Sequence, residues 1–132
     1  MSAVARARAL LGVRFRWQGR DADGLDCVGL AALALGLRGV PGGYRLRGGD
    51  PAAVAAWLDA RLVRVATWVA GDLLLVRSGP GQLHCAIWTG DGMIHADAGL
   101  GRVVERPGAP PWPVIGAWRQ AQGDRHRPER GE

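Results

Sequence analysis

Apolar residues recur at helical spacing in three segments of the first half of the chain. The first begins after Ser2, a good N-cap residue, and ends at Gly12. The second covers residues 27–37 and is apolar on nearly every side, which predicts a helix at the centre of the fold. The third begins with Asp50 as N-cap and Pro51 as first helical residue. Its apolar stripe, which predicts a buried tryptophan, comprises Val54, Trp57, Leu58 and Leu62.

The pattern changes to the alternation of β-strands after Gly71. Five short strands are predicted, separated by turns rich in Gly, Pro and Asp. They cover residues 72–77, 82–89, 93–97, 102–105 and 114–119. The segments 13–24 and 36–49, the second around Tyr44, are predicted to be loops. Helices followed by antiparallel strands indicate an α+β fold.

Length and composition indicate one globular domain. The chain has 132 residues, 48% of them apolar and 22% charged, which fits one compact domain over residues 1–119. Residues 120–132 are polar and charged, and we expect them to form a disordered tail. The formal charge is +5, and all 17 basic residues are arginines scattered along the chain. They indicate either a solvated basic surface or an anionic partner such as a cell-wall polymer, and no nucleic-acid-binding motif accompanies them.

The cysteine count and the length of the apolar runs limit the classes of protein to which the chain can belong. Two cysteines, Cys27 and Cys85, are too few for a disulfide scaffold or a Cys-rich zinc site. The chain shows no signal peptide and no apolar run long enough to span a membrane. We therefore expect synthesis in the cytoplasm and no membrane span.

The segment from Gly24 to Leu30 places Cys27 directly after Asp26, at the predicted start of the central helix. At this position the unpaired N–H groups and the positive end of the helix dipole favour thiolate over thiol. Cys27 is therefore a candidate nucleophile. The alternative is a structural role, since free cysteine is among the most buried residue types.

Two histidines, His84 and His95, lie on consecutive predicted strands. Because side chains alternate along a strand, Cys85 points away from the face of His84, and we assign it to the core as an inert residue. If residues 90–91 form a two-residue turn, His84 and His95 lie on the same face, and Asp97 lies opposite His84.

Nucleophilic catalysis by cysteine needs a thiolate, a base within hydrogen-bond reach, and a polar group that orients the base. Cys27, His84 and either His95 or Asp97 can fill these roles. A zinc site is the weaker interpretation, because the chain has no Cys-x-x-Cys or His-x-x-x-His spacing.

Five short motifs carry a family resemblance. They are Gly12-x-x-Phe15-x-Trp17 with Gly19, Asp26-Cys27-Val28-Gly29-Leu30, Gly71-Asp72, His84-Cys85-Ala86-Ile87 and Met93-Ile94-His95-Ala96. In combination, over about residues 2–119, they resemble the NlpC/P60 family of papain-like cysteine peptidases. The nearest group is the short cell-wall peptidases of phages and gene transfer agents. The resemblance implies N-terminal helices, one with the cysteine at its N-terminus, packed on a mostly antiparallel sheet of five to six strands.

The resemblance also implies roles and a reaction. Cys27 is the implied nucleophile, His84 the general base and His95 the orienting group. The implied activity is hydrolysis of amide bonds in the peptide stems of peptidoglycan, commonly between D-glutamate and diaminopimelate, with no metal or cofactor. Together with the missing signal peptide, it predicts action at the cell wall as part of a phage tail or gene transfer agent, with tail proteins as partners.

Two residues depart from the family pattern. The family usually has a tyrosine at Phe15, whose hydroxyl helps hold the oxyanion, and a serine at Val28. Loss of one such donor costs on the order of a hundredfold in rate. The expected substrate-binding or oxyanion region comprises Phe15, Trp17, Gln18, Asp26 and Val28, beside the backbone N–H of Cys27. The alternative function is a catalytically weakened wall-binding or structural tail module on the same fold.

Overall fold

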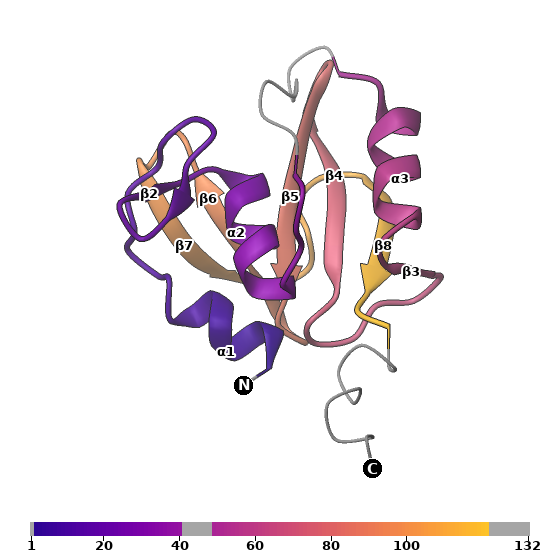
Figure 1. The fold of residues 1–132 in the computed structure, drawn as a ribbon, viewed down its shortest axis with the longest axis horizontal. Helices are drawn as coiled ribbons and strands as arrows, with labels where there is room; N and C mark the ends of the chain where they lie inside the picture. The colour runs from indigo at the N-terminus through magenta and orange to yellow at the C-terminus, as the bar shows by residue number, and fades with distance from the viewer. Residues whose placement is uncertain (1, 41–48, 122–132) are drawn as a thin grey trace.

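The computed structural model of the chain describes residues 2–40 and 49–121. Within these ranges three helices pack against a six-stranded antiparallel sheet (Figure 1). The predicted loop around Tyr44 and residues 122–132 of the predicted tail lie outside the described residues. The α+β architecture expected from the sequence is confirmed.

All three helices begin at the predicted N-cap residues. Helix α1 covers Ala3–Arg8, α2 covers Cys27–Leu35 and α3 covers Pro51–Asp59. The caps are Ser2, Asp26 and Asp50, whose side chains each accept a hydrogen bond from a backbone N–H of the first turn. The first helix ends at Arg8 and not at Gly12 as predicted, and turns cover the intervening residues.

The strands of the main sheet lie in the order β3-β8-β4-β5-β6-β7. Their bounds are Val63–Val65, Leu73–Gly79, Gln82–Trp88, Gly92–Asp97, Arg102–Pro107 and Val114–Arg119 for β3 to β8. The five predicted strands are confirmed within a few residues, and β3 was not predicted. A small hairpin of β1 (Arg20–Asp21) and β2 (Gly24–Leu25) also lies within a segment predicted to be loop. These short strands contain too few residues to show an alternating pattern.

The three helices contribute side chains to one core on a single face of the sheet. Trp118 of β8 is fully buried there, and Trp57 of α3 is half-buried against the same cluster. The opposite face carries a smaller cluster around Leu74, Val76 and Ala117. One face of the sheet is therefore the main core, and the other is partly covered by side chains of its own strands and loops.

The β5–β6 hairpin has the predicted two-residue turn. Ile87 pairs with Ile94 and Trp88 with Met93, and the N–H of Thr89 donates to the carbonyl of Gly92 at 2.8 Å. This register places His84 and His95 on the same face, as the even-numbered turn requires. Backbone pairing between β5 and β6 is limited to the positions next to the turn. The two strands are therefore not paired at His84.

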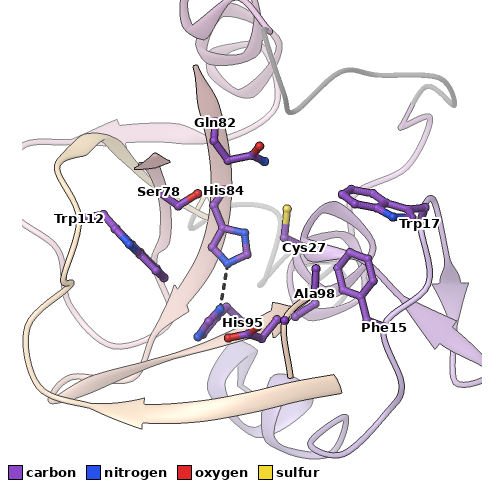
Figure 2. Close-up of a pocket in the computed structure, with 12 residues that line it drawn as sticks. Phe15, Trp17, Cys27, Ser78, Gln82, His84, His95, Ala98 and Trp112 are labelled. Carbon is purple, nitrogen blue, oxygen red and sulfur yellow. Dashed lines mark hydrogen bonds between the residues drawn. The ribbon is translucent and has the colours of Figure 1, made fainter. Parts of the chain in front are cut away.

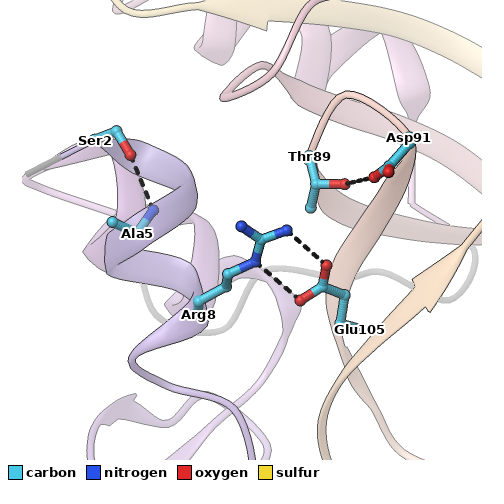
Figure 3. A network of polar contacts seen from close by, with 6 residues as sticks. All are labelled: Ser2, Ala5, Arg8, Thr89, Asp91 and Glu105. Atoms are coloured by element: carbon cyan, nitrogen blue, oxygen red, sulfur yellow. Dashed lines mark hydrogen bonds and ion pairs between the residues drawn. The ribbon is translucent and has the colours of Figure 1, made fainter.

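Two carboxylate–guanidinium pairs join distant parts of the chain. Arg8 of α1 binds Glu105 of β7 through two hydrogen bonds of 3.1 and 2.9 Å, and this pair lies near the Thr89–Asp91 contact of the β5–β6 turn (Figure 3). Asp72 is buried and accepts two hydrogen bonds of 2.9 Å from Arg119. The first pair attaches the N-terminal helix to the edge strand.

Asp26 has the most buried capping side chain. Its carboxylate is 0% exposed and accepts hydrogen bonds of 2.8 Å from the N–H of Gly29 and 2.8 Å from the N–H of Gln18. Arg20 also donates to it at 3.4 Å. One carboxylate therefore joins the start of α2 to the loop that precedes β1.

Asp26→Ala is expected to lower the free energy of unfolding by about 2–4 kcal/mol, because it leaves two backbone donors unpaired at a buried site. The matched control is Asp50→Ala, which removes the exposed cap of α3 and the 3.0 Å hydrogen bond that its side chain accepts from the N–H of Ala52. We expect about 1 kcal/mol for the control. Urea denaturation measures both losses, and equal losses would contradict the assigned role of Asp26.

Candidate active site

A pocket of about 310 Å³ opens beside the N-terminus of α2 (Figure 2). It lies between the loop after α1 and the ends of β4, β5 and β6. Its lining residues are Phe15, Trp17, Cys27, Ser78, Gln82, His84, His95, Ala96, Asp97, Ala98, Gly99 and Trp112. Segments from both halves of the chain therefore form one concave site.

The sulfur of Cys27 points into this pocket, although the residue is only 2% exposed. Cys27 is the first residue of α2, directly after its cap Asp26. Close packing fixes this end of the helix, since a Cβ on Gly29 would lie 2.0 Å from the carbonyl oxygen of Gly19. Only glycine fits at this position, and it allows the loop to cross against the helix.

The two predicted histidines are hydrogen-bonded to each other. The distance from Nε2 of His84 to Nδ1 of His95 is 2.9 Å, with ring planes at 89°. In Figure 2 the other ring nitrogen of His84 lies on the side of Cys27. Trp112 packs edge-on against both imidazoles, at centroid distances of 5.6 and 5.8 Å. The ring of His84 thus lies between the thiol and the second histidine.

The environment of His95 favours its neutral form. The residue is 3% exposed, and burial lowers its pKa; Arg106 lowers it further, while Asp97 acts in the opposite direction. A neutral imidazole donates from one nitrogen and accepts at the other. If His84 carries its proton on Nε2, Nδ1 of His95 is the acceptor, and Nδ1 of His84 is then free to accept a proton from Cys27.

The environment of Cys27 favours the thiol, contrary to the prediction from its place at a helix N-terminus. A hydrogen bond with the side chain of Cys85, and then burial, raise its pKa well above the usual thiol range. Its hydrogen bond with His84 acts in the opposite direction but is the smaller effect. The thiolate of Cys27 is therefore disfavoured in this environment.

Comparison with known proteins identifies the family of this site. The family model described as NlpC/P60 family matches residues 12–113. The chain belongs to the NlpC/P60 family. No curated protein is significantly similar to it in sequence.

Solved structures agree with this assignment. The NlpC/p60 domain of the peptidoglycan hydrolase SagA is 28% identical with a TM-score of 0.60, covering 90% of this chain and 97% of that domain. The peptidoglycan hydrolase RipB from Mycobacterium tuberculosis is 26% identical with a TM-score of 0.60, covering 89% of this chain and 62% of RipB. An NlpC/P60 family protein from Bacillus cereus is 23% identical with a TM-score of 0.64; the alignment covers 90% of this chain and 39% of that protein.

In this NlpC/P60 domain, two of the predicted oxyanion-region residues line the pocket. Phe15 and Trp17 pack edge to face at 4.9 Å between centroids, and Trp17 is 64% exposed at the pocket mouth. Gln18, Asp26 and Val28 are not among the described residues that line it. Gln18 is exposed, with its N–H held by Asp26, and Val28 packs against the core. That these three residues belong to the substrate-binding or oxyanion region stays a prediction.

Asp97 lines the pocket, but the structure places His95 against His84. The carboxylate of Asp97 accepts a hydrogen bond of 2.9 Å from the N–H of Leu100, in the turn after β6. Of the two residues that strand parity left open, His95 is the one hydrogen-bonded to His84.

Among the lining residues not predicted from the sequence, three have polar or aromatic side chains: Ser78, Gln82 and Trp112. Gln82 could have been found, because it lies two residues before His84 on the same strand and so shares its face. Trp112 comes from a Pro-rich loop whose course no periodic pattern predicts.

Neither a metal-binding group of three or more His, Cys, Asp or Glu residues nor a membrane-spanning helix occurs in residues 2–40 and 49–121.

Cys85 is buried in the core, as predicted, but it is not remote from the site. Helix α2 packs against both β5 and β6, at the place where these strands are no longer paired. Cys27 therefore reaches both His84 and Cys85, which leave β5 on opposite faces. The core position predicted for Cys85 is confirmed, and its effect on the pKa of Cys27 is a feature that strand alternation did not predict.

Cys85→Ala is expected to lower the pKa of Cys27, because it removes the largest cause of the upward shift. The measurement is the pH profile of iodoacetamide alkylation at Cys27, followed by mass spectrometry of the peptide that contains it. The alkylation midpoint should move to lower pH in Cys85→Ala, and less in Cys85→Ser, which keeps a hydrogen-bonding group. Identical profiles in all three proteins would contradict the assigned cause.

Proposed function

We propose that this NlpC/P60 domain is a cysteine peptidase that hydrolyses peptide stems of peptidoglycan. The observation that carries the proposal is the arrangement of Cys27, His84 and His95 within one pocket. SagA and RipB, which share this fold and family, are named as peptidoglycan hydrolases. The bond that we propose is cleaved is the amide between D-glutamate and diaminopimelate.

The first half of the proposed reaction forms an acyl-enzyme. Nδ1 of His84 takes the proton of Cys27 as the sulfur attacks the scissile carbonyl. The imidazolium of His84 keeps its Nε2–H bonded to neutral His95 at 2.9 Å. His84 then gives the proton to the leaving amine, the carbon–nitrogen bond breaks, and a thioester on Cys27 remains. The lowered pKa of His95 supports this role, because a protonated ring would not accept at Nδ1.

The second half returns the enzyme to its starting state. His84 takes a proton from water, and the resulting hydroxide attacks the thioester carbonyl. The carbon–sulfur bond breaks, and the sulfur leaves as a thiolate that recovers its proton from His84. The peptide acid is then released.

The oxyanion of each tetrahedral intermediate needs N–H donors at its own position. The backbone N–H of Cys27 is one candidate, since the first N–H groups of a helix have no acceptor within the helix. Phe15 contributes an apolar ring at this pocket and no donor. We propose that the ring shields the reacting carbonyl from water.

Cys27→Ala is expected to abolish release of products from a synthetic peptidoglycan stem peptide, because no nucleophile remains. His95→Ala should keep the nucleophile but lose the orienting group, with kcat lower by about 10²–10⁴-fold. His95→Asn, whose side-chain oxygen can accept from Nε2 of His84, should retain more activity than His95→Ala. Liquid chromatography with mass detection measures the products. Equal product release by wild type and Cys27→Ala would contradict the peptidase proposal.

A second candidate is a wall-binding or structural module with weakened catalysis. It is favoured by Phe15, which has no hydroxyl, and by the raised pKa of Cys27. This candidate predicts that the protein sediments with insoluble peptidoglycan while releasing no stem fragments. The same Cys27→Ala comparison separates the two functions, because binding should survive the substitution.

We also propose that a phage-like particle carries the domain to the cell wall. The support is the resemblance of its motifs to short peptidases of phages and gene transfer agents. Particles sedimented from a producing culture should then contain the chain in constant ratio to tail proteins. Recovery of the chain only in the particle-free fraction would contradict this proposal.

A further inference from the structure

A second thiol lies directly behind the one in the pocket. Cys27 and Cys85 are the only 2 cysteines of the chain. Both are free and buried, and both belong to the main core cluster. The side chain of Cys85 is the largest cause of the raised pKa of Cys27, which makes the two thiols neighbours. The proposed peptidase reaction uses Cys27 and gives Cys85 no task.

Small side chains on α2 allow the two elements to approach closely. The buried positions Cys27, Ala31 and Ala34 are four and three residues apart and lie on one helical face. On β5, Cys85 shares its sheet face with Leu83 and Ile87, within the same cluster. Helix α2 packs against β5. A disulfide of about 2.0 Å between the two sulfurs would join α2 to β5 at this packed surface.

The two thiols differ in access from solvent. Cys27 lines the pocket, whereas Cys85 is not among the described residues that line it. A small oxidant that enters the pocket therefore meets Cys27 first. For the oxidised sulfur of Cys27, Cys85 is a nearer thiol than any cysteine of a second molecule, because it lies against Cys27 on the core side.

We propose that Cys27 and Cys85 form a reversible intramolecular disulfide when the protein meets a peroxide. In the first step Cys27 loses its proton and the thiolate attacks the peroxide. The oxygen–oxygen bond breaks, a sulfenic acid forms on Cys27, and the leaving hydroxide takes up the thiol proton to form water. In the second step the sulfur of Cys85 displaces hydroxide from the sulfenic acid, and the thiol proton of Cys85 completes a second water. Two thiols are oxidised, and one peroxide is reduced to two waters.

The disulfide would switch the site off and protect it. Cys27 could not act as a nucleophile, and its sulfur would not advance to the sulfinic or sulfonic acid, which thiols do not reverse. An external dithiol would restore both thiols by exchange. This inference is independent of the proposed function, because oxidation of the two cysteines is measured without any substrate.

The test uses the folded 132-residue protein and hydrogen peroxide as the probe. After treatment, intact-mass analysis of wild type should show loss of two hydrogens, monomeric protein and no alkylatable thiol. Dithiothreitol should restore both thiols. Because the pKa of Cys27 is raised, oxidation should be faster at pH 9 than at pH 7.

Substitutions at the two cysteines separate the disulfide from other products of oxidation. Cys85→Ala should gain oxygen at Cys27 and become irreversibly oxidised, and Cys85→Val provides the same test if the alanine variant folds poorly. Cys27→Ala should form no intramolecular disulfide. The inference is overturned if wild type gains oxygen as Cys85→Ala does, forms only intermolecular dimers, or does not react at either pH.

Discussion

The buried carboxylate of Asp26 is the interaction on which the site depends. It caps α2 through Gly29 and at the same time holds the N–H of Gln18, at 2.8 Å in both cases. The loop that carries Phe15 and Trp17 is thereby attached to the helix that begins with Cys27. Gly29 permits this close crossing, since any side chain there would meet the Gly19 carbonyl. A single buried acid thus fixes two walls of the pocket relative to each other.

Burial also sets the charge state of the site at rest. It raises the pKa of Cys27, together with the larger effect of Cys85, and lowers the pKa of His95. Both groups are therefore held in their neutral forms. In the proposed mechanism, charge therefore develops on Cys27 only as its proton moves to His84.

Much of this arrangement could be predicted from sequence, because its signals are local. The Asp26 and Asp50 caps mark where two helices begin, and strand alternation with an even turn places His84 and His95 on one face. Strands β1, β2 and β3 could not be found, since two or three residues show no period. The contact between Cys85 and Cys27 was missed because alternation describes one strand, whereas the helix crosses where β5 and β6 separate.

In the proposed reaction, the sulfur of Cys27 bonds covalently to the carbonyl carbon of the substrate. Rapid mixing with a stem peptide, acid quenching and mass spectrometry of the peptide that contains Cys27 test it directly. We expect a transient adduct with the mass of the acyl fragment in wild type, and no such adduct in Cys27→Ala. Product accumulation in wild type without any adduct at Cys27, at mixing times short enough to resolve the first turnover, would contradict it.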